Sequence, residues 1–145
     1  MAKIPSSLHE HVNTAFPNNP TLIGTVQPNG WPQIGIRGST MVYDDEHFAL
    51  WERGMGTTNV QLKQGTKVVI FLRNQALREG GALRGGVARF YGTVEAVHTS
   101  GPVYDEVWRR LIEPEKKNDP QKKGYAVLIK TERVEDLNSK PVTLP

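Results

Sequence analysis

The sequence contains no cysteine, few aromatic residues and no long hydrophobic run. The lack of cysteine excludes disulfides, thiolate metal ligands and a cysteine nucleophile. No hydrophobic segment approaches the ~20 residues that a bilayer-spanning helix needs, and residues 1–12 lack an apolar signal region, so no membrane association is expected. A cytoplasmic protein is the simplest interpretation, and 145 residues correspond to one ordinary domain, residues 1–145.

The net charge of +3 is too small to indicate a nucleic-acid partner, but the charges are unevenly distributed. Residues 53–94 contain seven basic side chains and one acidic side chain, hence +6. The rest of the chain contains eleven basic and fourteen acidic side chains, hence −3. A basic middle segment favours contact with an anion, although a solvated basic face would have the same composition.

Hydrophobic alternation and turn residues predict six strands joined mainly by hairpins. The strands are expected at 22–26, 33–43, 47–51, 67–72, 86–97 and 125–130, and short helices at 6–16, 58–65 and 100–112. In the second strand, Ile34 and Ile36 are expected to face the core, and Gln33 and Arg37 the surface. Because strands do not alternate with long helices, the pattern favours a mainly β fold, a six-stranded antiparallel barrel with appended helices.

The segment 54–59, GMGTTN, follows a strand and precedes a predicted helix. Free amides at a helix start, together with glycines that allow close approach, are suited to binding a phosphate. The hydroxyls of Thr57 and Thr58 and the guanidinium groups of Arg37 and Arg53 would add hydrogen bonds. A capped turn without a ligand is the alternative, since Thr58 also begins a capping box.

Other chemistry has weaker signals. The four histidines are not spaced as ligands of a metal site, no metal is expected, and no catalytic acid, base or nucleophile stands out. Trp51 alternates away from Phe48 and Leu50, so it is expected to lie off the core face beside Arg53. There it would offer a flat surface to a planar heteroaromatic ligand or to a second subunit.

From Leu22 to Asn74, and more loosely to Val97, the chain resembles the FMN-binding split barrels related to pyridoxamine 5'-phosphate oxidase. The matching pieces are TVQPNGWPQ, the second strand through VYD, HFALW, GMGTTNVQL and KVVIFL. The resemblance implies a split β-barrel and a homodimer with FMN in clefts at the subunit interface. It implies cofactor contacts from the second strand and the loop after the third, here Arg37, Ser39, Thr40, Trp51, Arg53, Gly54, Met55, Thr57 and Thr58.

The chain departs from the oxidases at several of these positions. Gly35 and Thr40 stand where the second strand of the oxidases carries arginine and lysine, so that role falls to Arg37. Thr57 and Thr58 stand where their loop carries arginine and lysine, and the C-terminal substrate-binding Arg-Leu segment is missing. The resemblance therefore does not extend to vitamin B6 oxidation.

The function expected from this resemblance is an FMN-dependent oxidoreductase acting on a small molecule, in which the flavin carries the redox chemistry. A non-catalytic flavin carrier or electron-transfer protein and a deazaflavin-dependent reductase remain alternatives on the same fold. Binding of single-stranded nucleic acid through Arg73, Arg78, Arg84 and Arg89 is a weaker alternative, because only Phe90 and Tyr91 lie near enough to stack on bases.

Overall fold

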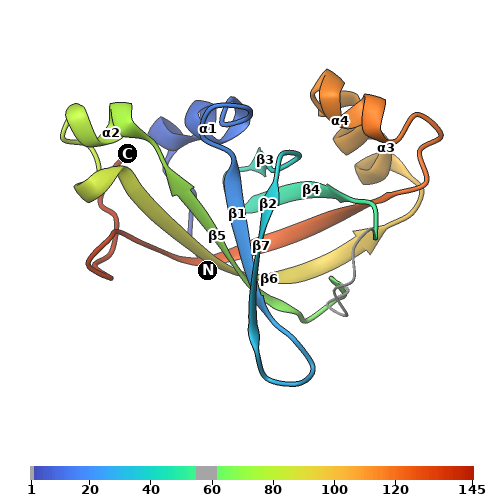
Figure 1. Cartoon of the computed structure of the whole chain (residues 1–145), viewed down its shortest axis with the longest axis horizontal. Coiled ribbons are helices and arrows are strands. Elements are labelled where there is room, and N and C mark those ends of the chain that lie inside the picture. Colours follow the sequence, from blue (N-terminus) through green and yellow to red (C-terminus); the bar gives the residue numbers. More distant parts are fainter. Residues whose placement is uncertain (1, 55–61) are drawn as a thin grey trace.

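The computed structural model describes residues 2–54 and 62–145 as one antiparallel sheet with four α-helices around it (Figure 1). The strands are β1 (Thr21–Val26), β2 (Pro32–Arg37), β3 (Met41–Asp44), β4 (His47–Glu52), β5 (Lys67–Arg73), β6 (Val87–His98) and β7 (Tyr125–Glu135). The helices are α1 (Ser6–Asn13), α2 (Gln75–Glu79), α3 (Pro102–Arg110) and α4 (Glu113–Asn118), with a 3-10 turn at Arg84–Gly86. None of these helices is long and apolar enough to cross a membrane.

The sheet has seven strands in the described residues, in the order β2-β1-β5-β6-β7-β4-β3, where six strands and a closed barrel were expected. The difference arises at residues 38–40, where the expected second strand breaks into β2 and β3. Arg37 ends β2, and its carbonyl oxygen accepts hydrogen bonds from the hydroxyls of Thr21 (3.1 Å) and Thr40 (3.2 Å). The chain then turns and pairs with β4 at the other edge of the sheet, so the edges β2 and β3 are joined by a turn and remain unpaired with each other.

The hairpin between β1 and β2 is the turn that the sequence predicts. Gly30 has a φ of +88°, which glycine adopts without strain, and its amide bonds to the Gln27 carbonyl at 2.9 Å. The hairpin projects beyond the rest of the sheet in Figure 1. In the same view, α3 and α4 lie together at one end of the molecule, and α2 and the C-terminus lie at the other.

The main hydrophobic core fills the inner side of the curved sheet. Phe48 and Phe90 are each 1% exposed, and their rings meet edge to face with centroids 4.8 Å apart. A second, smaller cluster lies on the outer side of β3, β4 and β7, where Val107 and Leu111 from the α3 region pack against Ala49. Helix α3 therefore covers one half of the outer face.

The other half of the outer face, formed by β2, β1, β5 and β6, carries apolar side chains that are open to solvent. Ile34 is 72% exposed and Ile36 is 62% exposed. Both were expected to face the core. Their cross-strand partners are Gly24 and Leu22, whereas Arg37 pairs with the buried Thr21, so it is Arg37 that faces the interior.

We call this region the uncovered face. It comprises the outward side chains of four neighbouring strands, namely Leu22, Gly24, Val26, Ile34, Ile36, Val69, Phe71, Arg89 and Tyr91. At its centre lies a shallow hollow of about 370 Å³. Gly24 forms part of the floor, and a Cβ built there would stand 2.8 Å from a methyl of Val69. Two cation–π pairs, Arg89 on Phe71 and Arg133 on Tyr91, edge the apolar surface.

His47 connects the β3–β4 hairpin to β6 through two carboxylates. Its Nδ1 lies 2.8 Å from Asp44 Oδ1 and its Nε2 lies 2.5 Å from Glu95 Oε2, while Lys130 is its cross-strand neighbour on β7. Partial burial acts to lower the pKa of His47, but the hydrogen bonds and charges of Asp44 and Glu95 outweigh it and the pKa is raised.

We therefore expect the free energy of unfolding to depend on pH through His47. A raised folded-state pKa means that the stabilisation is complete below the unfolded value of 6.5 and is lost as pH rises through the folded value. Urea denaturation between pH 6 and pH 9 should show this loss, and His47→Gln should remove it. If the free energy of unfolding depended on pH as steeply in His47→Gln as in the unmodified protein, His47 would not be the source of this pH dependence.

Candidate functional site

An ion pair spans the open edge of the sheet between β2 and β4. The Arg37 Nη2 atom lies 3.2 Å from Glu52 Oε2, and the two side chains are 29% and 13% exposed. Glu52 shares the inner face of β4 with Phe48 and Leu50, which follows from strand alternation. Arg37 was expected to lie on the surface, but it faces the interior and its guanidinium group connects the edge strand β2 to β4, while its binding of phosphate stays a prediction.

Glu52 holds a second donor as well. Its Oε1 atom accepts a hydrogen bond from the amide of Gly54 at 3.1 Å. Gly54 has a φ of +66°, a left-handed conformation that favours glycine. The carboxylate of Glu52 thus receives both the guanidinium group of Arg37 and a backbone amide of the segment that the sequence assigns to phosphate.

The inner sides of β2 and β7 carry other polar groups, one of them in Arg37 itself. The Nε of Arg37 and the Oε1 of Gln33 are buried, and neither has a hydrogen-bond partner among the described residues. Tyr125 lies opposite Glu52 on β7. Burial raises the pKa of the Tyr125 phenol, the negative charge of Glu52 raises it further, and the charge of Arg37 partly opposes this. Sequence analysis missed Glu52 and Tyr125, although alternation along β4 would have placed Glu52 on the inner face.

A hollow of about 100 Å³ lies beside the pair. Arg53 borders it and also donates to the Asn118 carbonyl at 3.4 Å. Two arginines and two glutamates line this hollow, namely Arg37, Arg53, Glu52 and Glu115. The charges of its lining are therefore balanced, whereas the sequence analysis named amides, hydroxyls and arginines for this site but no acidic residue.

Ser39 and Thr40 are placed at this site but their hydroxyls are already occupied. Ser39 is 4% exposed, and its Oγ accepts from the Trp51 amide at 3.0 Å and donates to the Trp51 carbonyl at 3.2 Å. Thr40 donates to Arg37 as described above. Both side chains therefore stabilise the turn between β2 and β3.

Trp51 does not offer an open aromatic surface. It lies off the main core face, as its alternation predicts, but it is only 2% exposed because α3 covers that side of the sheet. Its ring centroid lies 5.0 Å from that of Tyr104 and 5.1 Å from that of Trp108. The expectation of an exposed indole beside Arg53 is wrong, because the indole packs within the second hydrophobic cluster.

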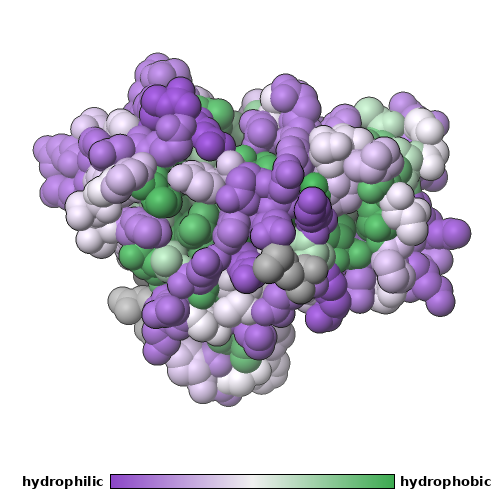
Figure 2. Space-filling view, turned by 180° about the vertical axis from the view of Figure 1, so that it is seen from behind, coloured by the Kyte–Doolittle hydropathy of each residue, from purple (hydrophilic) through white to green (hydrophobic). Residues whose placement is uncertain are grey.

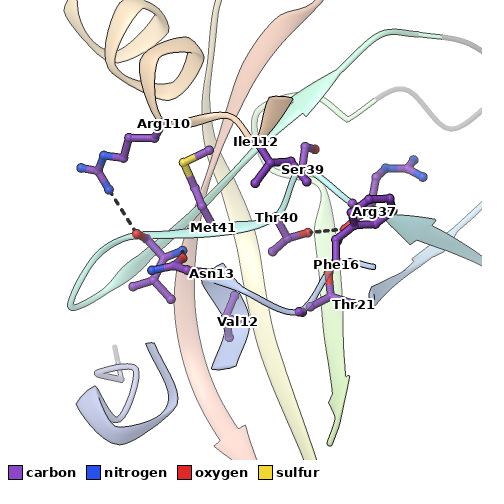
Figure 3. A pocket seen from close by; sticks show the side chains of 13 residues that line it. Val12, Asn13, Phe16, Thr21, Arg37, Ser39, Thr40, Met41, Arg110 and Ile112 are labelled. Carbon is purple, nitrogen blue, oxygen red and sulfur yellow. Dashed lines mark hydrogen bonds between the residues drawn. The ribbon is translucent and has the colours of Figure 1, made fainter. Parts of the chain in front are cut away.

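A larger cavity of about 190 Å³ lies on the other side of the same turn, between α1, β3 and the end of α3 (Figure 3). Phe16, Met41 and Ile112 supply apolar walls. At one end, Arg110 donates to the Val42 carbonyl at 3.2 Å, and the Asn13 side chain accepts from the Val42 amide at 2.8 Å. The two hollows share Arg37, Gly38 and Ser39, so the turn at 37–40 separates a charged pocket from a mainly apolar one.

The remaining candidate residues, Met55, Thr57 and Thr58, lie outside the described residues, as does the first part of the helix expected at 58–65, and residues 62–65 are described and not helical. Their contribution to a phosphate site stays a prediction. Arg53 and Gly54 lead directly into this segment from β4.

The two aromatic residues considered for stacking on single-stranded nucleic acid, Phe90 and Tyr91, do not present open rings. Phe90 is 1% exposed within the core. The Arg133 guanidinium lies 3.8 Å from the centroid of Tyr91 and covers that ring. Arg89 donates to the carbonyls of Asp136 and Leu137, so its guanidinium group is engaged inside the chain.

Comparison with solved structures identifies the fold. A HupZ structure from Group A Streptococcus matches with a TM-score of 0.67 and 23% identity, over 97% of this chain and 98% of that one. An FMN-binding protein from Syntrophomonas wolfei matches with a TM-score of 0.60 and 19% identity, over 96% and 88%. A pyridoxinephosphate oxidase family protein from Clostridium acetobutylicum, related to general stress protein 26, matches with a TM-score of 0.56 and 17% identity, over 90% and 88%.

A structure named F420 reductase matches with a TM-score of 0.59 and 14% identity, over 91% of this chain and 98% of that one. No protein-family model and no curated protein matches the chain. The structural matches confirm the predicted resemblance at the level of fold: the chain has the fold of the pyridoxamine phosphate oxidase-like and FMN-binding split barrels, with an open sheet of seven described strands.

Proposed function

We propose that this protein is an FMN-dependent oxidoreductase that acts on a small-molecule substrate as a homodimer in the cytoplasm. The observation that carries the proposal is the likeness along nearly the whole chain to split barrels, among them an FMN-binding protein. The isoalloxazine of FMN would supply the redox chemistry, and the protein would bind and orient the cofactor.

The donors at the open edge of the sheet support a phosphate-bearing ligand. The buried Nε of Arg37 has no partner in the part of the chain that the structure describes, Arg53 borders the same hollow, and the Gly54 amide contacts Glu52. These groups fit the phosphate of FMN when the Glu52 carboxylate moves away from the guanidinium group of Arg37. Thr57 and Thr58 would complete the phosphate contacts, as the sequence predicts.

The uncovered face supports the homodimer. Contiguous apolar surface on four strands is unusual for a monomer and is typical of an interface, and the sheet offers no helix of its own there among the described residues. Figure 2 shows the molecule from behind with mainly hydrophilic side chains and separate hydrophobic areas between them. A second copy related by a two-fold axis would cover the same patch on both subunits.

The first test is cofactor binding by the purified protein. We expect FMN to bind with a dissociation constant of about 1 µM or lower, which corresponds to about 8 kcal/mol, and to raise the melting temperature. Riboflavin, which lacks the phosphate, should bind at least about tenfold more weakly, because it forfeits the charge-assisted bonds. Absorbance spectra and thermal shift measure both, and a protein that remains colourless and unshifted with FMN would refute the proposal.

Two alternatives share the fold and are separated by further measurements. A non-catalytic flavin carrier would bind FMN but would show no turnover with NAD(P)H and any acceptor. A deazaflavin-dependent reductase is favoured by the likeness to the F420 reductase structure. Competition between FMN and a deazaflavin cofactor for one site would show which is preferred.

A further inference from the structure

Glu52 has the contacts of a bound anion. Its two carboxylate oxygens accept from the Arg37 guanidinium at 3.2 Å and from the Gly54 amide at 3.1 Å. Charge-assisted bonds from an arginine and from a backbone amide in a left-handed turn are the bonds that proteins use to hold phosphate. The side chain is also mostly buried at 13% exposure, so the carboxylate lies within the site.

We infer that the Glu52 carboxylate occupies the anion subsite at the open edge of the sheet and competes there with the phosphate group of a ligand. This inference rests on the proposed function for its ligand class, a phosphate monoester such as FMN. Glu52 then determines how tightly the phosphate end is held, and the sequence position two residues after Leu50 fixes this carboxylate on the inner face.

Exchange of the Glu52 carboxylate for a phosphate group is favoured because Glu52 does not bond every donor of the Arg37 guanidinium group. Glu52 bonds only the Nη2 atom of Arg37, whereas the Nε atom is buried and has no partner among residues 2–54 and 62–145. A phosphate monoester carries a charge of about −1.5 to −2 and three acceptor oxygens. It can therefore bond two nitrogens of the guanidinium fork at once. Glu52 must move aside when this happens, because a phosphate oxygen then takes the place of the Glu52 carboxylate at Nη2 and two anions at that distance repel each other.

The test is Glu52→Gln, which keeps the size of the side chain and an oxygen that can accept from Gly54 but removes the competing charge. Without that charge Arg37 is a partly buried cation that lacks its counter-ion, and it should bind an added anion more tightly. We expect FMN affinity to increase about tenfold, while riboflavin affinity changes less than about twofold, because riboflavin has no phosphate.

Glu115→Gln is the matched control. Glu115 lines the same hollow, but the described residues give it no ion pair to Arg37 and no bond to the Gly54 amide. An equal gain in both variants would show a general charge effect and would overturn the inference. Unchanged or weaker FMN binding in Glu52→Gln would overturn it as well.

A second measurement separates this inference from the proposed function. Inorganic phosphate is titrated while NMR follows the Nε–H resonance of Arg37, assigned by its absence in Arg37→Lys. We expect a saturable shift at lower phosphate concentration in Glu52→Gln than in the unmodified protein. If neither protein binds FMN but this difference persists, the proposed function fails and the subsite stands. If the Nε–H resonance does not respond to phosphate in either protein, the subsite is refuted.

Discussion

Replacing Ile34 and Ile36 together with aspartate is expected to convert the proposed dimer into a monomer. The two side chains are 72% and 62% exposed in the single chain and point away from the core, so their replacement removes no internal packing. In a two-fold dimer each substitution occurs on both sides of the interface, which places four new carboxylates in an apolar contact. Burying unpaired charge is costly enough that the dimer dissociation constant should rise more than about a hundredfold.

Sedimentation equilibrium at micromolar protein concentration measures the change, and circular dichroism checks that the fold persists. As a control, Thr14→Asp adds one negative charge per subunit, half of what the double variant adds, at the exposed C-terminal end of α1, and it should leave the dimer intact. If FMN binds between the subunits, the double variant should also lose FMN affinity. A double variant that stays dimeric, or an unmodified protein that is monomeric at about 100 µM, well above the dissociation constants typical of stable dimers, would refute the proposed interface.

The fold could be predicted largely because local signals agreed with the final structure. Strand alternation and the turn at Gly30 gave the hairpin, and Pro102 marked the start of the helix that covers β4. The break at residues 38–40 was missed because its cause is not local. The hydroxyl of Thr21, seventeen residues before Gly38, caps the end of β2, and pairing with β4 draws β3 to the opposite edge.

The errors at the candidate site have one physical origin. Alternation tells which residues of a strand share a face, but it does not tell which face another element covers. Ile34 and Ile36 were assigned to the core although their face is uncovered, and Trp51 was assigned to the surface although α3 covers it. The Arg37–Glu52 pair depends on the closeness of β2 and β4, two strands that are far apart in the pairing order of the sheet, so it could not be predicted from sequence spacing.

The largest effect on stability is expected from replacing Asp119, which anchors the turn after α4 to β4. Its carboxylate accepts from the Trp51 indole at 2.8 Å, from the Gly124 amide at 2.7 Å and from the Lys123 amide at 2.9 Å. The residue is 7% exposed. Asp119→Ala leaves these donors without partners, two of them in fully buried bonds, and should lower the free energy of unfolding by about 3 kcal/mol.

The effect should also depend on pH. Burial acts to raise the pKa of Asp119, but the hydrogen bonds from Trp51 and the two amides outweigh it, so the pKa lies below the ordinary value of 3.8. A lowered folded-state pKa stabilises the protein above pH 3.8, and this stabilisation is lost as pH falls through the folded value. In urea denaturation between pH 6 and pH 2.5, the free energy of unfolding should therefore fall less with decreasing pH in Asp119→Asn than in the unmodified protein.

A double-mutant cycle with Trp51→Phe distinguishes the specific bond from general damage to the turn. Phenylalanine keeps much of the contact with Tyr104 and Trp108 but has no N–H donor, so Asp119→Asn should cost less in that background than in the unmodified protein. Strictly additive effects would mean that the indole–carboxylate bond contributes nothing, and that the two backbone amides alone account for the buried charge. A clear coupling energy would instead establish that the bond between the Trp51 indole and the Asp119 carboxylate anchors the turn after α4 to β4.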